Sequence, residues 1–141
     1  MSQGESLAQQ AAAIAYRRIG GSLQICLIRR KDSREWGIPK GLVDPGDTRE
    51  QTALNETWEE AGLRGRVIGE PIGTYTYEKW GTTFTVAVYL LEVLAQQDRW
   101  QEARFRERRW TSLGEAASLL SGHPVRPLVD RAMRLLAPGV T

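Results

Sequence analysis

The chain has 141 residues, about the length of one domain, and its 19 lysines and arginines against 17 aspartates and glutamates give a formal charge of +2. So balanced a charge excludes the global positive field of a nucleic-acid or membrane binder, and we expect neither DNA nor a membrane as partner. The single cysteine, Cys26, excludes an intrachain disulfide framework and a cysteine-based zinc site, which favours an intracellular protein.

Targeting signals are not evident in the sequence. No run approaches the roughly 18 apolar residues of a membrane span, and the first ten residues lack the charged and apolar regions of a signal peptide. We therefore expect a soluble, cytoplasmic protein with a flexible leader at residues 1–10 and a single domain at residues 11–138.

The first predicted elements are two strands, a long loop and a helix. AAAIAYRR (11–18) and LQICLIRR (23–30) flank Gly20-Gly21 and predict a hairpin. Residues 31–47 are rich in glycine and proline and predict a loop. A helix of about fourteen residues follows, because Asp47 or Thr48 can cap its start, Glu50 or Gln51 can complete a capping box, and Gly62 suits a left-handed stop.

The second half alternates in the manner of strands before it becomes helical. Strands are predicted at 65–70, 73–80, 82–93 and 104–112, with a turn at Trp80-Gly81. Ser112 and Glu115 predict the start of a short helix through Leu120, and residues 124–136 predict a final helix. The order of elements indicates an α/β fold, a sandwich of helices on a mixed sheet.

Three carboxylates crowd the predicted helix. Glu56, Glu59 and Glu60 are related by i, i+3 and i, i+4, so their side chains share one face. Like charges at these spacings cost an isolated helix roughly 0.2 to 0.5 kcal/mol per pair. Arg64 lies beyond the Gly62 stop, so nothing within the helix compensates. A solvated acidic face is one interpretation; the other is a site for Mg²⁺ or Mn²⁺, which prefer oxygen ligands.

The spacing around these carboxylates is distinctive. It runs from a glycine through an acid to a paired glutamate, a second glycine and an apolar residue, at Gly41, Asp47, Glu56, Glu59, Glu60, Gly62 and Leu63. This pattern resembles the box of the Nudix hydrolases. Asp47, Asn55 and Thr57 depart from it, because the family usually has glutamate, arginine and an aliphatic residue there. A weaker contact of the loop with the helix is the expected consequence.

The resemblance implies a fold and a chemistry. The fold is a Nudix-like α/β/α sandwich with a central mixed sheet, and the activity is hydrolysis of a phosphoanhydride bond by water with Mg²⁺ or Mn²⁺ as cofactor. The implied metal site consists of Gly41, Glu56, Glu59 and Glu60, with the three glutamates as catalytic residues. Glu59 or Glu60 is the implied general base. In some members of the family the base lies outside the box, and the candidates for that role here are Glu102 and Glu107.

Phosphate groups need positive charge as well as a metal. Lys40 is the foremost candidate, because the box fixes its position, and the further basic candidates for substrate binding are Arg17, Arg29, Lys31, Arg34 and Lys79. Tyr77 and Trp80 are candidates for substrate contact near a hairpin tip. His123 precedes a proline at a helix start, which favours a surface or capping role, with a phosphate contact from residues 123–126 as the alternative.

Two further resemblances concern the substrate. WGIPKG (36–41) resembles the matching loop of diadenosine polyphosphate hydrolases, and residues 98–120 resemble diphosphoinositol polyphosphate phosphohydrolases. A small anionic phosphoanhydride is therefore the expected partner of a monomer or homodimer. The alternatives are an RNA 5′ pyrophosphohydrolase, a nucleoside triphosphate pyrophosphatase, and a non-catalytic nucleotide-binding domain.

Overall fold

The structure is a computed structural model, and it describes residues 6–137. The elements in chain order are β1 (Ser6–Ile19), β2 (Ser22–Arg30), β3 (Lys40–Leu42), α1 (Arg49–Ala61), β4 (Leu63–Lys79), β5 (Thr82–Gln96), β6 (Arg106–Ser112), α2 (Leu113–Leu119) and α3 (Arg126–Leu136).

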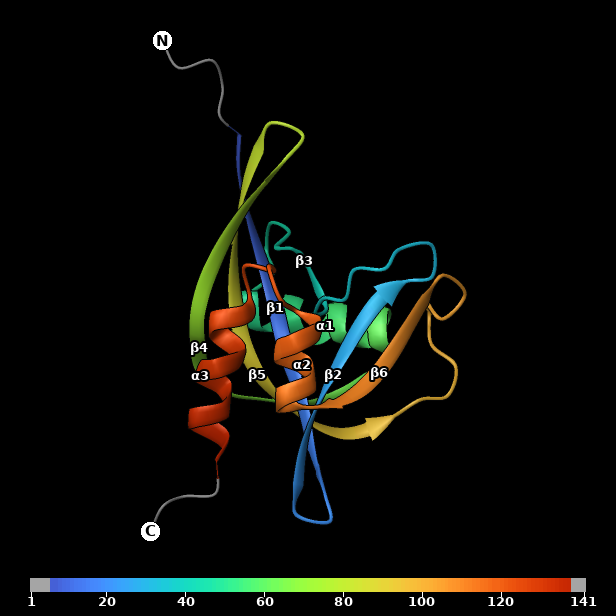
Figure 1. Ribbon diagram of the computed structural model, residues 1–141. Coiled ribbons are helices and arrows are strands. Elements are labelled where there is room, and N and C mark those ends of the chain that lie inside the picture. Colours follow the sequence, from blue (N-terminus) through green and yellow to red (C-terminus); the bar gives the residue numbers. More distant parts are fainter. Residues whose placement is uncertain (1–5, 138–141) are drawn as a thin grey trace.

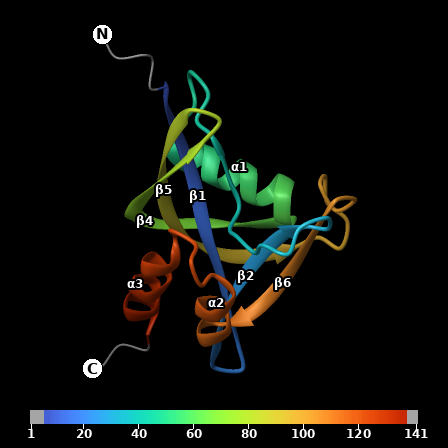
Figure 2. The same ribbon diagram turned by 45° about the horizontal axis from the view of Figure 1, so that its top comes forward.

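A mixed sheet forms the centre of the described residues. Its strand order is β4-β5-β1-β2-β6, with β3 paired to β1 away from this path. The pairing of β1 with β5 is parallel, and the other pairings are antiparallel. Helix α1 covers one face of the sheet, and α2 and α3 cover the other (Figures 1 and 2). The predicted α/β/α sandwich with a mixed sheet is confirmed.

Strand β1 is buried on both faces and separates two cores. Ile14 and Tyr16 point toward the core that includes α2 and α3, whereas Ala13 and Ala15 point toward the core beneath α1. Successive side chains of a strand point to opposite faces, so this alternation divides large residues from small ones. The alanines leave room for α1 close to the sheet, and α1 thereby holds a fixed position.

Helix α1 begins and ends where its sequence indicates. Thr48 is the N-cap, its hydroxyl accepts a hydrogen bond from the Gln51 N–H, and the Gln51 side chain accepts one from the Thr48 N–H. Gly62 ends the helix in the left-handed conformation, at φ 67°. The C-terminal carbonyls of Glu60 and Ala61 accept hydrogen bonds from side chains outside the helix, the indole of Trp100 and the guanidinium of Arg108.

Three expectations differ from the structure. Residues 6–10, expected in a flexible leader, belong to β1, because parallel pairing with β5 from Ser6↔Thr82 onward gives their backbone partners; residues 1–5 lie outside the described residues. The loop at 31–47 contains the short strand β3. The separate strands expected at 65–70 and 73–80 form one strand, β4, with an irregularity between Ile68 and Gly73.

Candidate functional site

The site begins where α1 meets the loop before β3. Glu60 is 7% exposed, and its Oε1 accepts a hydrogen bond from the backbone N–H of Lys40 at 3.2 Å. Because β3 pairs with β1, with Ala12 opposite Lys40, the sheet holds this backbone group in position against the helix.

Gly41 gives Glu56 the space that its side chain occupies. A Cβ atom at position 41 would stand 2.6 Å from the Cγ and from the Oε1 of Glu56. Such separations do not occur between real atoms, so any other residue would displace the Glu56 side chain. The requirement for glycine here is therefore one of close packing, in line with its role in the sequence pattern.

The carboxyl groups of Glu56 and Glu60 lie close enough for each to act on the pKa of the other. Two carboxylates at such a separation repel each other unless a proton or a cation lies between them. Burial raises the pKa of Glu60 to about 8, against the attraction of Arg106, and burial also raises the pKa of Glu56. At neutral pH this pair therefore holds a proton in the absence of another cation.

Arg106, at the start of β6, lies beside the acidic pair. Its guanidinium forms ion pairs with Glu60 at 3.7 Å and with Glu102 at 2.5 Å. The sequence pattern gave no sign of this residue, because it lies 46 positions after Glu60 and only the tertiary structure brings the two together. Arg64, the nearest basic residue in sequence, instead lies over the ring of Trp58 at 3.9 Å.

The residues meet some requirements of a divalent cation. A pair of neighbouring carboxyl groups that holds a proton offers oxygen ligands to a cation that displaces this proton. In residues 6–137, however, no three His, Cys, Asp or Glu side chains are gathered as a metal site needs. Glu59 lies on the same helix at a half-buried position, and its carbonyl accepts a hydrogen bond from the Glu102 N–H at 3.1 Å. The pair Glu56 and Glu60 thus fits a metal, and Glu59 lies close enough for its charge to raise the pKa of Glu56.

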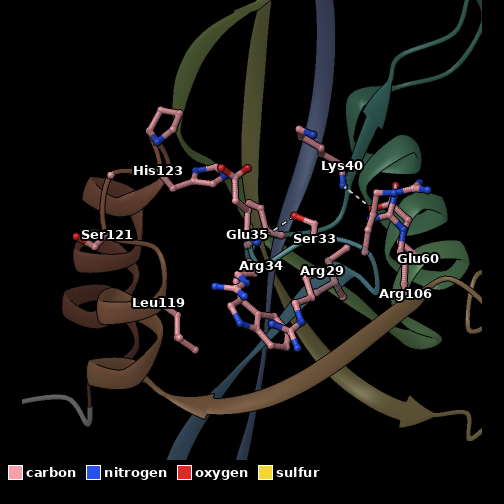
Figure 3. A pocket seen from close by; sticks show the side chains of 17 residues that line it. Arg29, Ser33, Arg34, Glu35, Lys40, Glu60, Arg106, Leu119, Ser121 and His123 are labelled. Atoms are coloured by element: carbon pink, nitrogen blue, oxygen red, sulfur yellow. Dashed lines mark hydrogen bonds and ion pairs between the residues drawn. The ribbon is translucent and has the colours of Figure 1, made fainter.

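A pocket of about 700 Å³ opens beside Glu60 and contains more polar than apolar surface. Its walls come from the end of β2, the 31–39 loop, β6 and the α2–α3 connection, as Figure 3 shows. The charged and polar residues that line it are Arg29, Arg30, Ser33, Arg34, Glu35, Lys40, Glu60, Arg106, Ser121 and His123.

The predicted substrate-binding residues divide into two groups. Arg29, Arg34 and Lys40 line the pocket. Lys31 is exposed, and both Lys31 and Lys79 lie outside the pocket lining. The pKa of Lys40 is lowered mainly by burial, and the charge of Lys79 lowers it further. Arg29, Arg34, Lys40 and Lys79 therefore form a basic region at and near the acidic pair.

Arg17 is not brought to the acidic pair. It pairs with Gln24 at the far end of the β1–β2 hairpin, whereas Arg29 lies at the opposite end of β2. Its guanidinium lies over the ring of Trp110 at 3.9 Å. Arg17, a predicted substrate-binding residue, therefore lies apart from Arg29, because antiparallel strands end at opposite ends of their hairpin.

The two candidates for a general base outside the box have different partners. Glu102 forms an ion pair with Arg106, which also pairs with Glu60, whereas Glu107 forms an ion pair with Arg29. Tyr77 donates a hydrogen bond to Gln10, and its ring lies 5.3 Å from the Lys40 ammonium group.

At the tip of the β4–β5 hairpin, Trp80 is 86% exposed. His123 caps as expected, because its Nδ1 accepts a hydrogen bond from the Val125 N–H at 3.0 Å. It also lines the pocket.

The departures from the sequence pattern have local consequences. Asn55 and Asp47 are both exposed, and the Asp47 N–H donates to the Asp44 carbonyl. Thr57 is fully buried, and its hydroxyl donates to the Ala53 carbonyl at 2.7 Å, so its polar group is satisfied. The loop is held to the helix instead by the contacts of Lys40 and Gly41 with the two glutamates.

Taken with the fold, this arrangement defines an α/β/α domain with an acidic helix beside a basic pocket. The NUDIX domain family matches residues 8–132, and the chain belongs to this family. The resemblance seen in the sequence is thereby confirmed.

Several relatives have names that describe their activity. The chain is 27% identical over 131 residues to an asymmetrical bis(5′-nucleosyl)-tetraphosphatase of Caenorhabditis elegans, covering 90% of this chain and 95% of that protein. It is 31% identical over 105 residues to the enzyme of the same name from Sus scrofa, covering 72% and 71%. It is 30% identical over 115 residues to Nudix hydrolase 4 of Arabidopsis thaliana, covering 80% of this chain. The alignments span 55% and 57% of the lengths of the plant Nudix hydrolases 4 and 21.

A solved structure has the same fold along nearly the whole chain. The crystal structure of the C. elegans Ap4A hydrolase is similar with a TM-score of 0.77 and 26% identity, covering 93% of this chain and 99% of that one. Within residues 6–137, no helix has both the length and the apolar character to cross a membrane.

Proposed function

We propose that this chain is a Mg²⁺- or Mn²⁺-dependent pyrophosphohydrolase that uses water to cleave a phosphoanhydride bond in a dinucleoside polyphosphate or a related nucleoside diphosphate derivative. The observation that carries the proposal is the carboxyl pair of the half-buried Glu56 and the buried Glu60, beside a pocket lined by Arg29, Arg34 and Lys40. A cytoplasmic location is part of the same proposal and rests on the sequence alone.

Glu56 and Glu60 would hold the cation, with Glu59 and the backbone of Gly41 as further ligands. A divalent cation supplies charge neutralisation on the phosphate oxygens and makes water more acidic. The carboxyl pair gives up its proton when a cation takes its place, which links cation binding to pH. Lys40 and the arginines of the pocket hold the phosphate chain against this pair.

The general base is one of the carboxylates in the pair or beside it. Glu102 fits this role better than Glu107, because its charge acts on Glu56 and it lies next to Glu60 through Arg106. Glu107 is tied to Arg29 instead. Glu59 and Glu60 remain the alternatives that the family resemblance implies.

The relatives favour a dinucleoside polyphosphate as substrate, since two of them are named as tetraphosphatases of this kind. The pattern of carboxylates fixes the chemistry without fixing the leaving group. The same assay must therefore include the alternative substrates, which are diphosphoinositol polyphosphates, nucleoside triphosphates and triphosphorylated RNA.

The test combines a substrate panel with matched variants. Products from the four substrate classes are resolved by mass, with Mg²⁺ and with Mn²⁺, for the unaltered protein and for Glu59→Gln, Glu60→Gln and Glu50→Gln. Glu50 is exposed in the first turn of α1, so its variant controls for the loss of one charge on this helix. We expect turnover to fall strongly in the first two variants and to persist in the third.

Two results would contradict the proposal. The first is turnover that survives removal of metal by EDTA or is unchanged in Glu60→Gln. The second is tight nucleotide binding with no product over hours in Mg²⁺, which would identify a nucleotide-binding domain without catalysis.

A further inference from the structure

The imidazole of His123 has a fixed orientation in the pocket wall. Its Nδ1 accepts the Val125 N–H, so in the neutral ring the proton is on Nε2. Burial and the nearby Lys40 lower the pKa of His123, which favours the neutral ring. The ring of Tyr75 meets it edge-on, with centroids 5.7 Å apart. Nε2 lies toward Gly37 in the pocket lining, where an added Cβ would stand 3.7 Å away.

Glu35 supplies an acceptor beside this donor. It belongs to the 31–39 loop, where its N–H donates to the Ser33 hydroxyl at 3.0 Å. Glu35 and His123 both line the pocket, and Figure 3 shows their side chains there. The charge of Glu35 acts on the pKa of His123, which places the two groups within electrostatic reach of each other. The pocket thus presents an N–H donor and a carboxylate acceptor from two separate loops.

An aromatic surface lies in the same pocket. Trp36 follows Glu35 directly and lines the pocket, and the guanidinium of Arg29 lies 4.7 Å from its ring centroid. Flat rings and guanidinium groups both stack on planar heterocycles. The donor and the acceptor lie on the side of the pocket away from Glu60 (Figure 3), and the ring of Trp36 lines the same pocket.

We propose that Glu35 and His123 are specificity residues that read the edge of a nucleobase, with the His123 Nε2–H donating to a base acceptor and the Glu35 carboxylate accepting from a base N–H. This inference rests on the proposed function and extends it to the group attached to the phosphate chain. Adenine, guanine and uracil each present an acceptor beside an N–H, so the subsite suits nucleobases as a class.

The same carboxylate disfavours an inositol carrying phosphates. Such a ring presents negative acceptors on its periphery, and the Glu35 carboxylate repels them, whereas a base donates an N–H hydrogen bond to it. Of the two substrate classes that the sequence resembles, the subsite therefore selects the nucleotide.

Competition by small ligands isolates the contribution of the base. Adenosine monophosphate and ribose 5-phosphate differ by the base alone, and each is measured as an inhibitor of diadenosine tetraphosphate hydrolysis. The variants are Glu35→Ala, Glu35→Gln, which keeps an acceptor without the charge, and His123→Asn. The asparagine side chain can still accept a hydrogen bond from the Val125 N–H, so the cap is kept. It lacks the Nε2–H of the imidazole, so the donor in the pocket is lost. Asp32→Asn removes a charge from the same loop outside the pocket lining and is the control.

Loss of one hydrogen bond should raise the inhibition constant of adenosine monophosphate about tenfold in Glu35→Ala and His123→Asn. The inhibition constant of ribose 5-phosphate should stay within about twofold, and Asp32→Asn should change neither. In Glu35→Gln, hydrolysis of a diphosphoinositol polyphosphate should rise relative to that of diadenosine tetraphosphate. For diadenosine tetraphosphate, the change should appear in KM, while kcat stays nearly constant.

The inference fails if adenosine monophosphate and ribose 5-phosphate change together, or if neither changes, while thermal melting shows folded variants. It also fails if diguanosine and diadenosine tetraphosphates are hydrolysed no better than a diphosphoinositol polyphosphate by the unaltered protein. Failure of the proposed function is a different result, since it would appear as turnover that survives EDTA or Glu60→Gln, or as no hydrolysis of any substrate.

Discussion

Replacement of Gly41 by alanine tests how the site is assembled. The new Cβ would stand 2.6 Å from two atoms of the Glu56 side chain, so that side chain must turn away. A displaced rotamer costs about 0.5–1.5 kcal/mol, and the melting temperature should fall by only a few degrees. The effect on metal binding should be larger, because Glu56 is moved from Glu60. We expect an about 10- to 100-fold loss of turnover at fixed Mg²⁺.

The assay titrates Mg²⁺ against turnover and records thermal melting for each protein. Gly114→Ala is the control, because a Cβ there meets nothing within 4 Å and the residue lies in α2. It should keep turnover and gain up to about 1 kcal/mol of stability. Wild-type turnover and an unchanged half-saturating Mg²⁺ concentration in Gly41→Ala would refute the reasoning.

Three further changes have defined outcomes. Because the pKa of Glu60 is about 8 in the folded protein against 4.5 for the free group, the folded state binds more protons between these values, so metal-free melting temperatures should fall as pH rises from about 4.5 to 8. Calorimetry should show a shallower fall of the melting temperature with pH in Glu60→Gln. Equal slopes in the two proteins would contradict the assignment of this pH dependence to Glu60. Arg106→Gln should lower the free energy of unfolding in urea by about 1–3 kcal/mol, more than Arg30→Gln at an exposed ion pair; equal losses would mean that Arg106 does not stabilise the acidic cluster. Thr48→Ala should cost about 1 kcal/mol in the same titration and leave turnover at 25 °C unchanged, and a loss of turnover would show that the cap also positions the site.

The fold and the acidic helix could be predicted because their signals are local. The caps of α1 need only Thr48, Gln51 and Gly62, which lie next to the helix that they end. The alternation of β2 and the glycines of its turn specify the first hairpin in the same way. The length of β1 could not be predicted from local signals, because its first residues pair with β5, more than 70 positions later.

The site was predicted in part. Glu56, Glu60, Gly41 and Lys40 are brought together as their spacing indicates. Arg106 comes from a strand whose register against β2 the sequence does not reveal.

The position of Arg17 could have been anticipated, because antiparallel pairing places the end of the first strand opposite the start of the second. His123 was found as a cap, and its place in the pocket depends on how the α2–α3 connection packs against the 31–39 loop.

The central claim is that the carboxyl groups of α1 bind a divalent cation at the pocket. A crystal soaked in Mn²⁺ and measured for anomalous scattering tests it most directly. The account predicts an anomalous peak within coordination distance of Glu56 and Glu60, with Arg106 withdrawn from Glu60 and Glu59 turned toward the ion. A fully soaked crystal with no peak there, and with Glu60 still paired to Arg106, would contradict it.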